Sequence, residues 1–357
     1  MKRISTKDLI PGMKIAEDVY TYNEQLILSK GLILTDKTIT RLEFYSILTV
    51  KVEEELAFVS TQTQEESSYS ERIKSSSAFK EFKQHFDQSV NHFHALMDDI
   101  VEKNTPLDTA RLLDSTLELL QTSEGSVNVF DMLHNMRQYD DSTYAHSLNV
   151  TLICNVFARW LQFSEEDINL ATLCGLLHDV GKIMIPDSII KKPSQLTDDE
   201  FSVIKTHPLE GYQILKMQNI NESIKNAALM HHERCDGSGY PLGLVGNKID
   251  KFAKIVSIAD VYDAMTSARV YRGPLCPFKV IELFETEGIQ KYDAKYVLTF
   301  LECIVNTYLQ NRVHLTNGIE GDIVFINKNA LSKPVIKSGN NFIDLSARSD
   351  LQIQFLM

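Results

Sequence analysis

Apolar residues recur at intervals of three and four along most of the chain between residues 79 and 310. The first such run has one apolar face, which consists of Phe79, Phe82, Phe86, Val90, Phe93, Met97 and Ile100. This spacing places the side chains on one side of a long helix. The same spacing recurs, with few interruptions, in residues 112–120, 127–136, 143–160, 168–177, 198–217, 223–233, 252–267, 277–285 and 294–310. The pattern predicts an α-helical domain.

Both ends of the chain have shorter apolar runs separated by turn signals. Near the amino terminus, Pro11-Gly12 and Gly31 lie beside runs at residues 25–28 and 47–52. Near the carboxyl terminus, apolar and polar residues alternate in GDIVFI, KPVIK and LQIQFL. Alternation with a period of two is typical of strands. We therefore expect a mainly α protein with a small β-containing amino-terminal domain and a short β-rich carboxyl-terminal tail.

A polar stretch separates the first domain from the helical pattern. Residues 60–77, STQTQEESSYSERIKSSS, contain almost no large apolar side chains, which favours a linker. We expect five segments: a β-containing domain that is a candidate for regulation (1–57), a linker (58–78), a helical connector (79–124), the main helical domain (125–312) and the β-rich tail (313–357).

Composition narrows the classes of function and location. The net charge of −12 and the pI near 5.3 disfavour binding to nucleic acid polymers or anionic lipid, which need a basic surface. The sequence has no run of 18 apolar residues and no apolar core of a signal peptide near its start, so we expect neither membrane insertion nor export. Five cysteines without a C-x-x-C pair are typical of reduced thiols in a cytoplasmic protein.

Histidines cluster in the helical domain. Ten occur in the chain, and five of them are His146, His178, His207, His231 and His232. One histidine on an apolar helix face is usually a core residue, but five in one domain favour a site that binds borderline divalent metals. The adjacent His231 and His232 point about 100° apart on a helix, so they can serve different ions, or one can contact substrate.

Four longer motifs surround these histidines and give a resemblance to a known family. They are HDVGKIMIPDSIIKKPSQLT (178–197), THPLEG (206–211), HHERCDGSGYPLGL (231–244) and IADVYDAMTSARVYR (258–272). In order and spacing they resemble the HD-GYP family, a branch of the HD phosphohydrolases, over residues 125–312. Gly239-Tyr240-Pro241 matches the signature of this branch.

The resemblance implies an HD-type helical bundle that holds two divalent ions, iron or manganese. It also implies hydrolysis of cyclic di-GMP to linear pGpG, GMP or both by a hydroxide held between the ions. Asp179 is expected to bridge the two ions, and Lys182 to assist catalysis. By position, the metal ligands are His146, His178, Asp179, His207, His231, His232 and Asp260.

The resemblance also suggests residues around the metals. Arg269 and Arg272 match substrate-binding positions, and either can otherwise be a surface arginine. Tyr240 is a candidate to stack on guanine or to order its loop, and Asp263 to orient a ligand histidine or cap a helix. Ser142 stands where some family members have a glutamate for a third metal, so we expect two ions.

Three alternatives stay open on the sequence alone. The domain can be a non-catalytic regulator that binds cyclic di-GMP, or a hydrolase of another cyclic dinucleotide or nucleotide. It can also be a scaffold whose phenylalanine-rich helix joins two copies of the chain in a homodimer. Candidate protein partners are signalling proteins that contact the loop around Tyr240 or the amino-terminal domain.

Overall fold

A computed structural model gives the architecture of most of the chain. It describes residues 2–6, 9–20, 26–35, 38–39, 42, 47, 49–53, 69–103, 105–121, 129–136, 143–192, 194–267 and 274–357. The chain divides into two compact units, residues 70–307 and residues 1–69 with 308–357. All five cysteines are among the described residues, and none forms a disulfide bond. No helix in the described ranges combines the length and apolar character needed to cross a membrane.

The amino-terminal part of the smaller unit has two short antiparallel strand pairs. They are β1 (Lys2–Ser5) with β4 (Thr49–Val52) and β2 (Val19–Tyr20) with β3 (Leu26–Leu28). Gly12 and Gly31, at the expected turns, have φ angles of 94° and 85° that glycine adopts without strain. Ile15, Leu34 and Leu42 are fully buried in the apolar core of this part.

The carboxyl-terminal part of the same unit is a five-stranded antiparallel sheet with strand order β8-β7-β6-β5-β9. Its strands are β5 (Arg312–Leu315), β6 (Glu320–Phe325), β7 (Val335–Ser338), β8 (Asn341–Asp344) and β9 (Ile353–Leu356). The 3-10 turn η5 (Leu345–Ala347) follows β8. Three of these strands lie in the runs whose alternation predicted them. The sequence analysis did not predict β5 and β8.

The larger unit is helical, so the mainly α prediction is confirmed. Its first helices are α2 (Tyr69–Ser75), α3 (Ser77–Lys103), α4 (Thr109–Gln121), α5 (Val129–Met136), α6 (Thr143–Trp160) and α7 (Glu165–Leu177). The middle of the unit contains η2 (Val180–Met184), α8 (Asp187–Ile190), α9 (Asp198–Ile204), α10 (His207–Lys216), α11 (Glu222–Met230) and η3 (Gly246–Lys248). The last elements are α12 (Lys251–Thr266), α13 (Pro277–Leu283), the π-helical turn η4 (Phe284–Gly288), α14 (Ile289–Lys291) and α15 (Ala294–Thr307).

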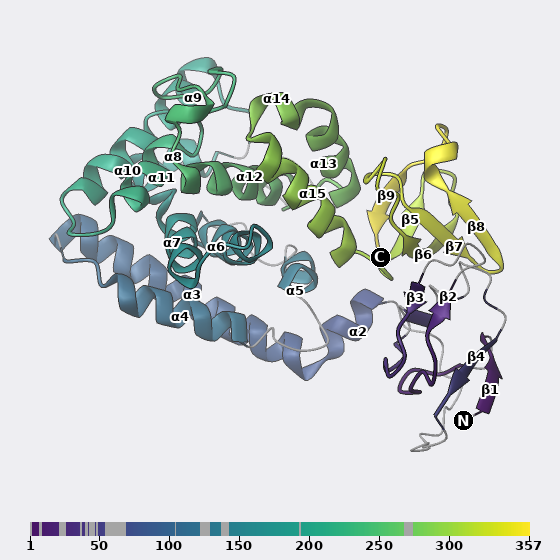
Figure 1. Cartoon of the computed structure of the whole chain (residues 1–357). Coiled ribbons are helices and arrows are strands. Elements are labelled where there is room, and N and C mark those ends of the chain that lie inside the picture. The colour runs from purple at the N-terminus through teal and green to yellow at the C-terminus, as the bar shows by residue number, and fades with distance from the viewer. Residues whose placement is uncertain are drawn as a thin grey trace. The chain divides into compact units, whose positions relative to one another are not determined.

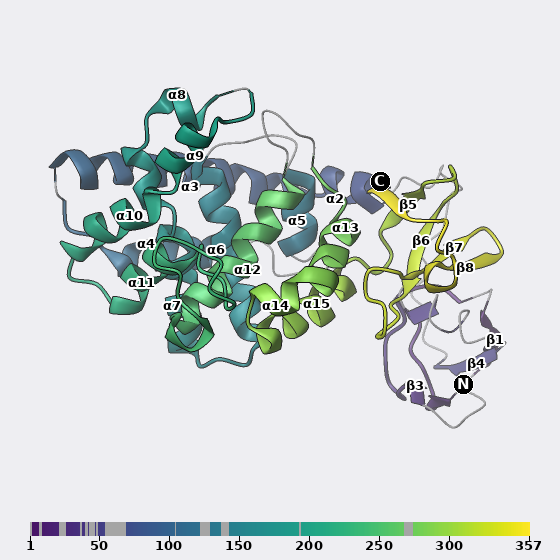
Figure 2. The ribbon, with the colours of Figure 1, turned by 90° about the horizontal axis from the view of Figure 1, so that it is seen from above.

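Five helices form the centre of this unit. α6 packs against α7 and α12, and α11 packs against α7, α10 and α12. α3 and α4 lie side by side along α6 and α7 (Figure 1). The view from above shows α6, α7, α10, α11 and α12 gathered in one group, with α8 and α9 at its edge (Figure 2). Four of these helices have site residues at or next to one end, and α12 has them in its interior.

Local sequence determines where several of these helices begin. Ser164 caps α7 by accepting a hydrogen bond from the backbone N–H of Asp167, and Asn221 and Asp250 cap α11 and α12 in a similar way. Thr197 and Glu200 form a reciprocal capping box at the start of α9. These caps satisfy backbone N–H groups that a helix leaves without partners.

Two stretches differ from the sequence prediction. Residues 198–217 form two helices, because Pro208 lacks the N–H that a continuous helix would need and instead lies in the first turn of α10. The expected linker at 58–78 contains α2 and the first residues of α3. The buried Ile73 anchors α2, and the Ser76 hydroxyl accepts a hydrogen bond from the N–H of Phe79 to cap α3.

Candidate metal centre

The seven expected metal ligands lie on, or directly after, five helices that meet at one place. His146 is in the first turn of α6, and His207 is the first residue of α10. His178 and Asp179 directly follow α7, and His231 and His232 directly follow α11. Asp260 lies on the buried side of α12. The fold therefore brings together side chains that are far apart in the sequence.

These side chains form two groups that share no residue, and a third group, His178, Asp179 and His231, links the two. Within each group the candidate ligand atoms lie within 4.8 Å of one another. The first group is His207, His231 and His232, and the second is His146, His178 and Asp260. We call them the first and second triad.

Asp179 offers one carboxylate oxygen to each triad. Its Oδ1 lies 3.3 Å from Nε2 of His207 and 3.7 Å from Nε2 of His231. Its Oδ2 lies 3.3 Å from Nε2 of His178 and 3.7 Å from Nε2 of His146. A carboxylate in this position is suited to contacting two cations at once.

Backbone carbonyls orient three of the histidines. Their Nδ1–H groups donate to carbonyl oxygens about one turn earlier: His178 to Gly175 (2.7 Å), His207 to Ile204 (2.7 Å) and His231 to Ala228 (2.9 Å). Because a carbonyl can only accept, each ring carries its proton on Nδ1 when it is neutral. The Nε2 lone pairs therefore face Asp179, as metal ligation requires.

The protein leaves two buried atoms of this cluster without a hydrogen bond. Among the described residues, Nε2 of His178 and Oδ1 of Asp179 have no hydrogen-bonding partner. Both side chains are almost fully buried, His178 at 0% and Asp179 at 3% exposure. Leaving buried polar atoms without partners is costly, and a cation removes that cost. Imidazole nitrogen and carboxylate oxygen together fit borderline divalent ions.

Without a cation, the carboxylates and histidines determine one another's charge. Burial disfavours the charged form of His146, but hydrogen bonds to Asp260 and Asp263 outweigh it and raise its pKa to about 9. Burial lowers the pKa of His231 to about 4, and it also lowers the pKa of His232. Despite burial, the pKa values of Asp179 and Asp260 fall well below their usual range, because of neighbouring histidines at both residues and also Lys182 at Asp179.

Asp263 contacts a metal-ligand candidate directly. Its Oδ2 accepts a hydrogen bond of 2.8 Å from Nδ1 of His146, and the side chain is fully buried. Its Oδ1 accepts a hydrogen bond of 3.1 Å from the hydroxyl of Ser267, near the end of α12. Asp263 thus holds the His146 ring so that Nε2 points toward Asp260, 3.0 Å away.

The remaining candidates occupy different positions. The ammonium group of Lys182 contacts Oδ2 of Asp179. The Tyr240 ring stacks on His232, with 4.7 Å between the ring centroids and 27° between the planes. This contact covers one face of the ring and helps to order the loop. Arg269 and Arg272, expected to bind substrate, lie outside the described residues, as does Ser142.

Glu233 is a structural anchor that the sequence analysis missed. It is 2% exposed, and its two carboxylate oxygens accept the N–H groups of Leu242 (2.6 Å) and Leu244 (2.8 Å). A side chain at Gly239 would collide with the backbone of Glu233, so only glycine fits there. The sequence offered one sign of this role, which is an acidic residue directly after two candidate ligand histidines.

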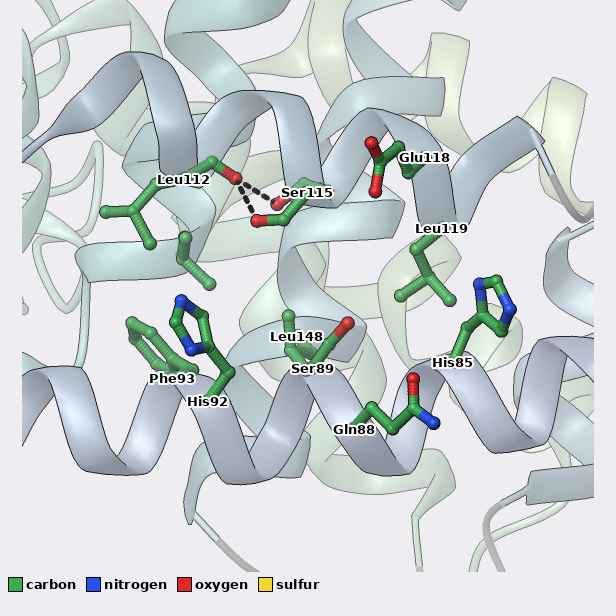
Figure 3. Close-up of a pocket in the computed structure, with 12 residues that line it drawn as sticks. His85, Gln88, Ser89, His92, Phe93, Leu112, Ser115, Glu118, Leu119 and Leu148 are labelled. Atoms are coloured by element: carbon green, nitrogen blue, oxygen red, sulfur yellow. Dashed lines mark hydrogen bonds between the residues drawn. The ribbon is translucent and has the colours of Figure 1, made fainter.

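A separate hollow of about 250 Å³ lies between α3 and α4 (Figure 3). His85 and His92 of α3 and Glu118 of α4 line it together with Ser115 and Leu119. The histidines and the glutamate are residue types that commonly bind metals. Within the described ranges, however, they do not form a group of three ligand atoms close enough for one ion. The metal centre is therefore the better candidate site.

Comparison with known proteins identifies the family. The model of the HD domain family matches residues 110–296, just over half of the chain. The chain belongs to the HD domain family, in its HD-GYP branch. A solved structure of an HDG"Y"P protein, Bd1817 from Bdellovibrio bacteriovorus, covers 85% of this chain and 99% of its own. It has a TM-score of 0.52 and 15% sequence identity, which supports the fold.

Two curated relatives also match this HD-GYP chain. Cyclic di-GMP phosphodiesterase PA4108 of Pseudomonas aeruginosa is 32% identical over 249 residues, which are 69% of this chain. The 3'3'-cGAMP-specific phosphodiesterase 1 of Vibrio cholerae is 38% identical over 145 residues, which are 41% of this chain. The matched regions span 58% of the first relative and 34% of the second.

Proposed function

We propose that this chain is a metal-dependent phosphodiesterase that hydrolyses cyclic di-GMP to linear pGpG, GMP or both. The observation that carries the proposal is the position of Asp179 between two triads of metal-binding side chains. The HD domain is a fold of metal-dependent hydrolases, and the relative PA4108 is named as a cyclic di-GMP phosphodiesterase.

The proposed metals are two divalent ions, iron or manganese. His207, His231 and His232 would hold one ion, His146, His178 and Asp260 the other, and Asp179 would contact both. When bound, such ions supply Lewis acidity toward phosphate oxygens and lower the pKa of water. The seven side chains offer imidazole nitrogens and carboxylate oxygens, which are donor atoms that suit both ions.

The protein's own groups would then orient the substrate. Lys182 places its ammonium group beside Asp179, where it can donate a hydrogen bond to a non-bridging phosphate oxygen. Asp263 holds His146, and Glu233 holds the loop that carries Tyr240. Arg269 and Arg272 stay proposed substrate-binding residues on the strength of their sequence positions.

The decisive experiment is product analysis with anaerobically purified protein loaded with Fe²⁺ or Mn²⁺. We expect linear pGpG or GMP to appear from cyclic di-GMP, with about two metal ions per chain by elemental analysis. His178→Ala should lose both the products and most of the metal. Tight binding of intact cyclic di-GMP without turnover in either metal would refute the proposal and favour the regulator.

A second candidate substrate comes from the match to the Vibrio cholerae enzyme, which is named as specific for 3'3'-cGAMP. The same triads would serve either cyclic dinucleotide, because the scissile phosphodiester is common to both. The kcat/KM values for cyclic di-GMP and 3'3'-cGAMP, measured on one metal-loaded preparation, decide between them. A value at least tenfold higher for 3'3'-cGAMP would assign the chain to the second substrate.

A further inference from the structure

Lys205 lies beside the metal centre and plays no part in the mechanism described above. It follows α9 and precedes the ligand His207 by two residues. Its ammonium nitrogen lies 4.8 Å from the ring centroid of Phe201 and 5.5 Å from that of Tyr240. Both distances are within the range of cation–π attraction. Two aromatic rings from different elements therefore hold this charge at a defined position.

Lys205 differs from nearby lysines because its ammonium group has no carboxylate partner among the described residues. Lys191 pairs with Asp187, and Lys192 pairs with Glu200. Among the described residues, Lys205 forms no ion pair, and its side chain is exposed to solvent. A cation that is oriented by rings but not neutralised is available to an anionic ligand.

The ring of Tyr240 connects Lys205 to the metal centre. Tyr240 stacks on the ligand candidate His232, and its backbone N–H donates to the carbonyl of His232 at 3.2 Å. Glu233 anchors the loop that carries Tyr240, and this holds the backbone of Tyr240 in place. Tyr240 thus contacts both the ammonium of Lys205 and one member of the first triad.

We propose that Lys205 binds the second phosphate of the cyclic dinucleotide, the one that is not cleaved. The inference rests on the proposed function, since it assumes a substrate with two phosphodiesters. The metals and Lys182 would neutralise the charge of the scissile phosphate, and Lys205 offers the other phosphate a cation that no carboxylate of the described residues neutralises. The net charge of −12 makes such a cation the more necessary for an anionic substrate.

The test compares a substrate with two phosphates and a substrate with one. Steady-state kinetics are measured for cyclic di-GMP and for bis(p-nitrophenyl) phosphate, with the metal-loaded full chain. Lys205→Met keeps the hydrocarbon stem and removes the charge. We expect it to raise KM for cyclic di-GMP about tenfold and to lower the kcat/KM ratio of cyclic di-GMP to bis(p-nitrophenyl) phosphate by the same factor.

Two further variants separate charge from packing. Lys205→Arg retains the charge and the ring contacts, so the ratio should stay within about threefold of that of the unaltered protein. Lys216→Met removes an exposed charge from the far end of α10 and should leave both substrates unaffected. KM for cyclic di-GMP should also lose part of its salt dependence in Lys205→Met only.

Two results would overturn the inference while the proposed function stands. One is an unchanged KM for cyclic di-GMP in Lys205→Met, and the other is an equal loss with both substrates, which would mean that the lysine only packs α9 against the loop. If the unaltered protein cleaves bis(p-nitrophenyl) phosphate but not cyclic di-GMP, the proposed function fails and the inference fails with it.

Discussion

Histidines occupy two contrasting regions of the helical unit, the metal centre and the hollow between α3 and α4. In the metal centre, His178, His207 and His231 are fully buried, and each donates Nδ1–H to a backbone carbonyl. Beside the hollow, His85 and His92 are exposed on α3 (Figure 3). The residue type is the same, but only the first set has fixed rings and lone pairs that converge.

The carboxylates of the two regions differ in the same way. Asp179 is 3% exposed and lies between two triads, whereas Glu118 is exposed at the edge of the hollow. Burial makes uncompensated polar atoms costly, so a buried cluster needs a cation, and an exposed one is satisfied by water. The comparison shows that metal-ligand residue types indicate a site only when they are buried and oriented together.

The largest expected effect is that of Asp179→Asn. This change removes the charge that both triads share and retains the size of the side chain. We expect kcat/KM for cyclic di-GMP to fall about 10³-fold, equivalent to about 4 kcal/mol, with loss of bound metal. Enzyme kinetics and elemental analysis of the same preparation measure both effects.

Glu118→Gln is the matched control in the other region. It removes an exposed carboxylate of the hollow and should leave metal content and kcat/KM within about twofold. Circular dichroism checks that both variants stay folded. Equal effects of the two substitutions would break the distinction between the regions.

A second prediction concerns how tightly the metal centre is packed. A methyl group at Gly181 would collide with the carbonyl oxygen of His207 and the backbone of Gly211. Since backbone atoms cannot move aside cheaply, we expect Gly181→Ala to lower the melting temperature by about 10 °C. Ser89→Ala, on the wall of the hollow, should change it by about 1 °C or less. Differential scanning calorimetry measures the melting temperatures of both variants. Equal melting temperatures would contradict the prediction of tight packing at Gly181.

The third prediction is a pH dependence in metal-free protein. Burial opposes the charge of His146, but its hydrogen bonds to Asp260 and Asp263 raise its pKa to about 9. A folded-state pKa above the unfolded value of 6.5 stabilises the fold fully below pH 6.5, and this stabilisation is lost as pH rises through about 9. We expect His146→Gln to lower the melting temperature by about 5 °C at pH 6 and by about 1 °C at pH 10.

Thermal melts in the presence of a chelator measure this difference across the pH range. Asp263→Asn removes one of the two carboxylates that favour protonated His146, so the loss should move to lower pH in that variant. A difference between wild type and His146→Gln that stays constant from pH 6 to 10 would contradict the assignment. It would mean that the two carboxylates do not hold a proton on His146.

The sequence predicted the regular helices well because their pattern is local. The expected helix at 143–160 coincides with α6, and the one at 252–267 differs from α12 by one residue at each end. The break before α10 was missed, although Pro208 in the first turn could have indicated it. Strand β8 was missed because its side chains are mostly exposed and show no alternation, and β5 was missed because its four residues closely follow the helical pattern of α15.

The candidate site was predictable as a set of residues but not as an arrangement. The resemblance to the HD-GYP family implied all seven ligand candidates, and the structure brings them together. The two triads, and the position of Asp179 between them, depend on how five helices pack. Glu233 binds N–H groups nine and eleven residues downstream, and Lys205 meets Tyr240 from another element. Such contacts have no local period and therefore required the structure.

The smallest expected effect is that of His92→Ala, which tests whether the hollow contributes to the reaction at all. His92 lies on the exposed side of α3, so truncation should change the melting temperature by about 1 °C or less and kcat/KM by less than about twofold. Metal content should stay as in the unaltered protein, because His92 is in neither triad. A loss of metal or of turnover in this variant would show that α3 acts on the metal centre through α6. Both regions would then contribute to the reaction, and they would differ only in their distance from the metals.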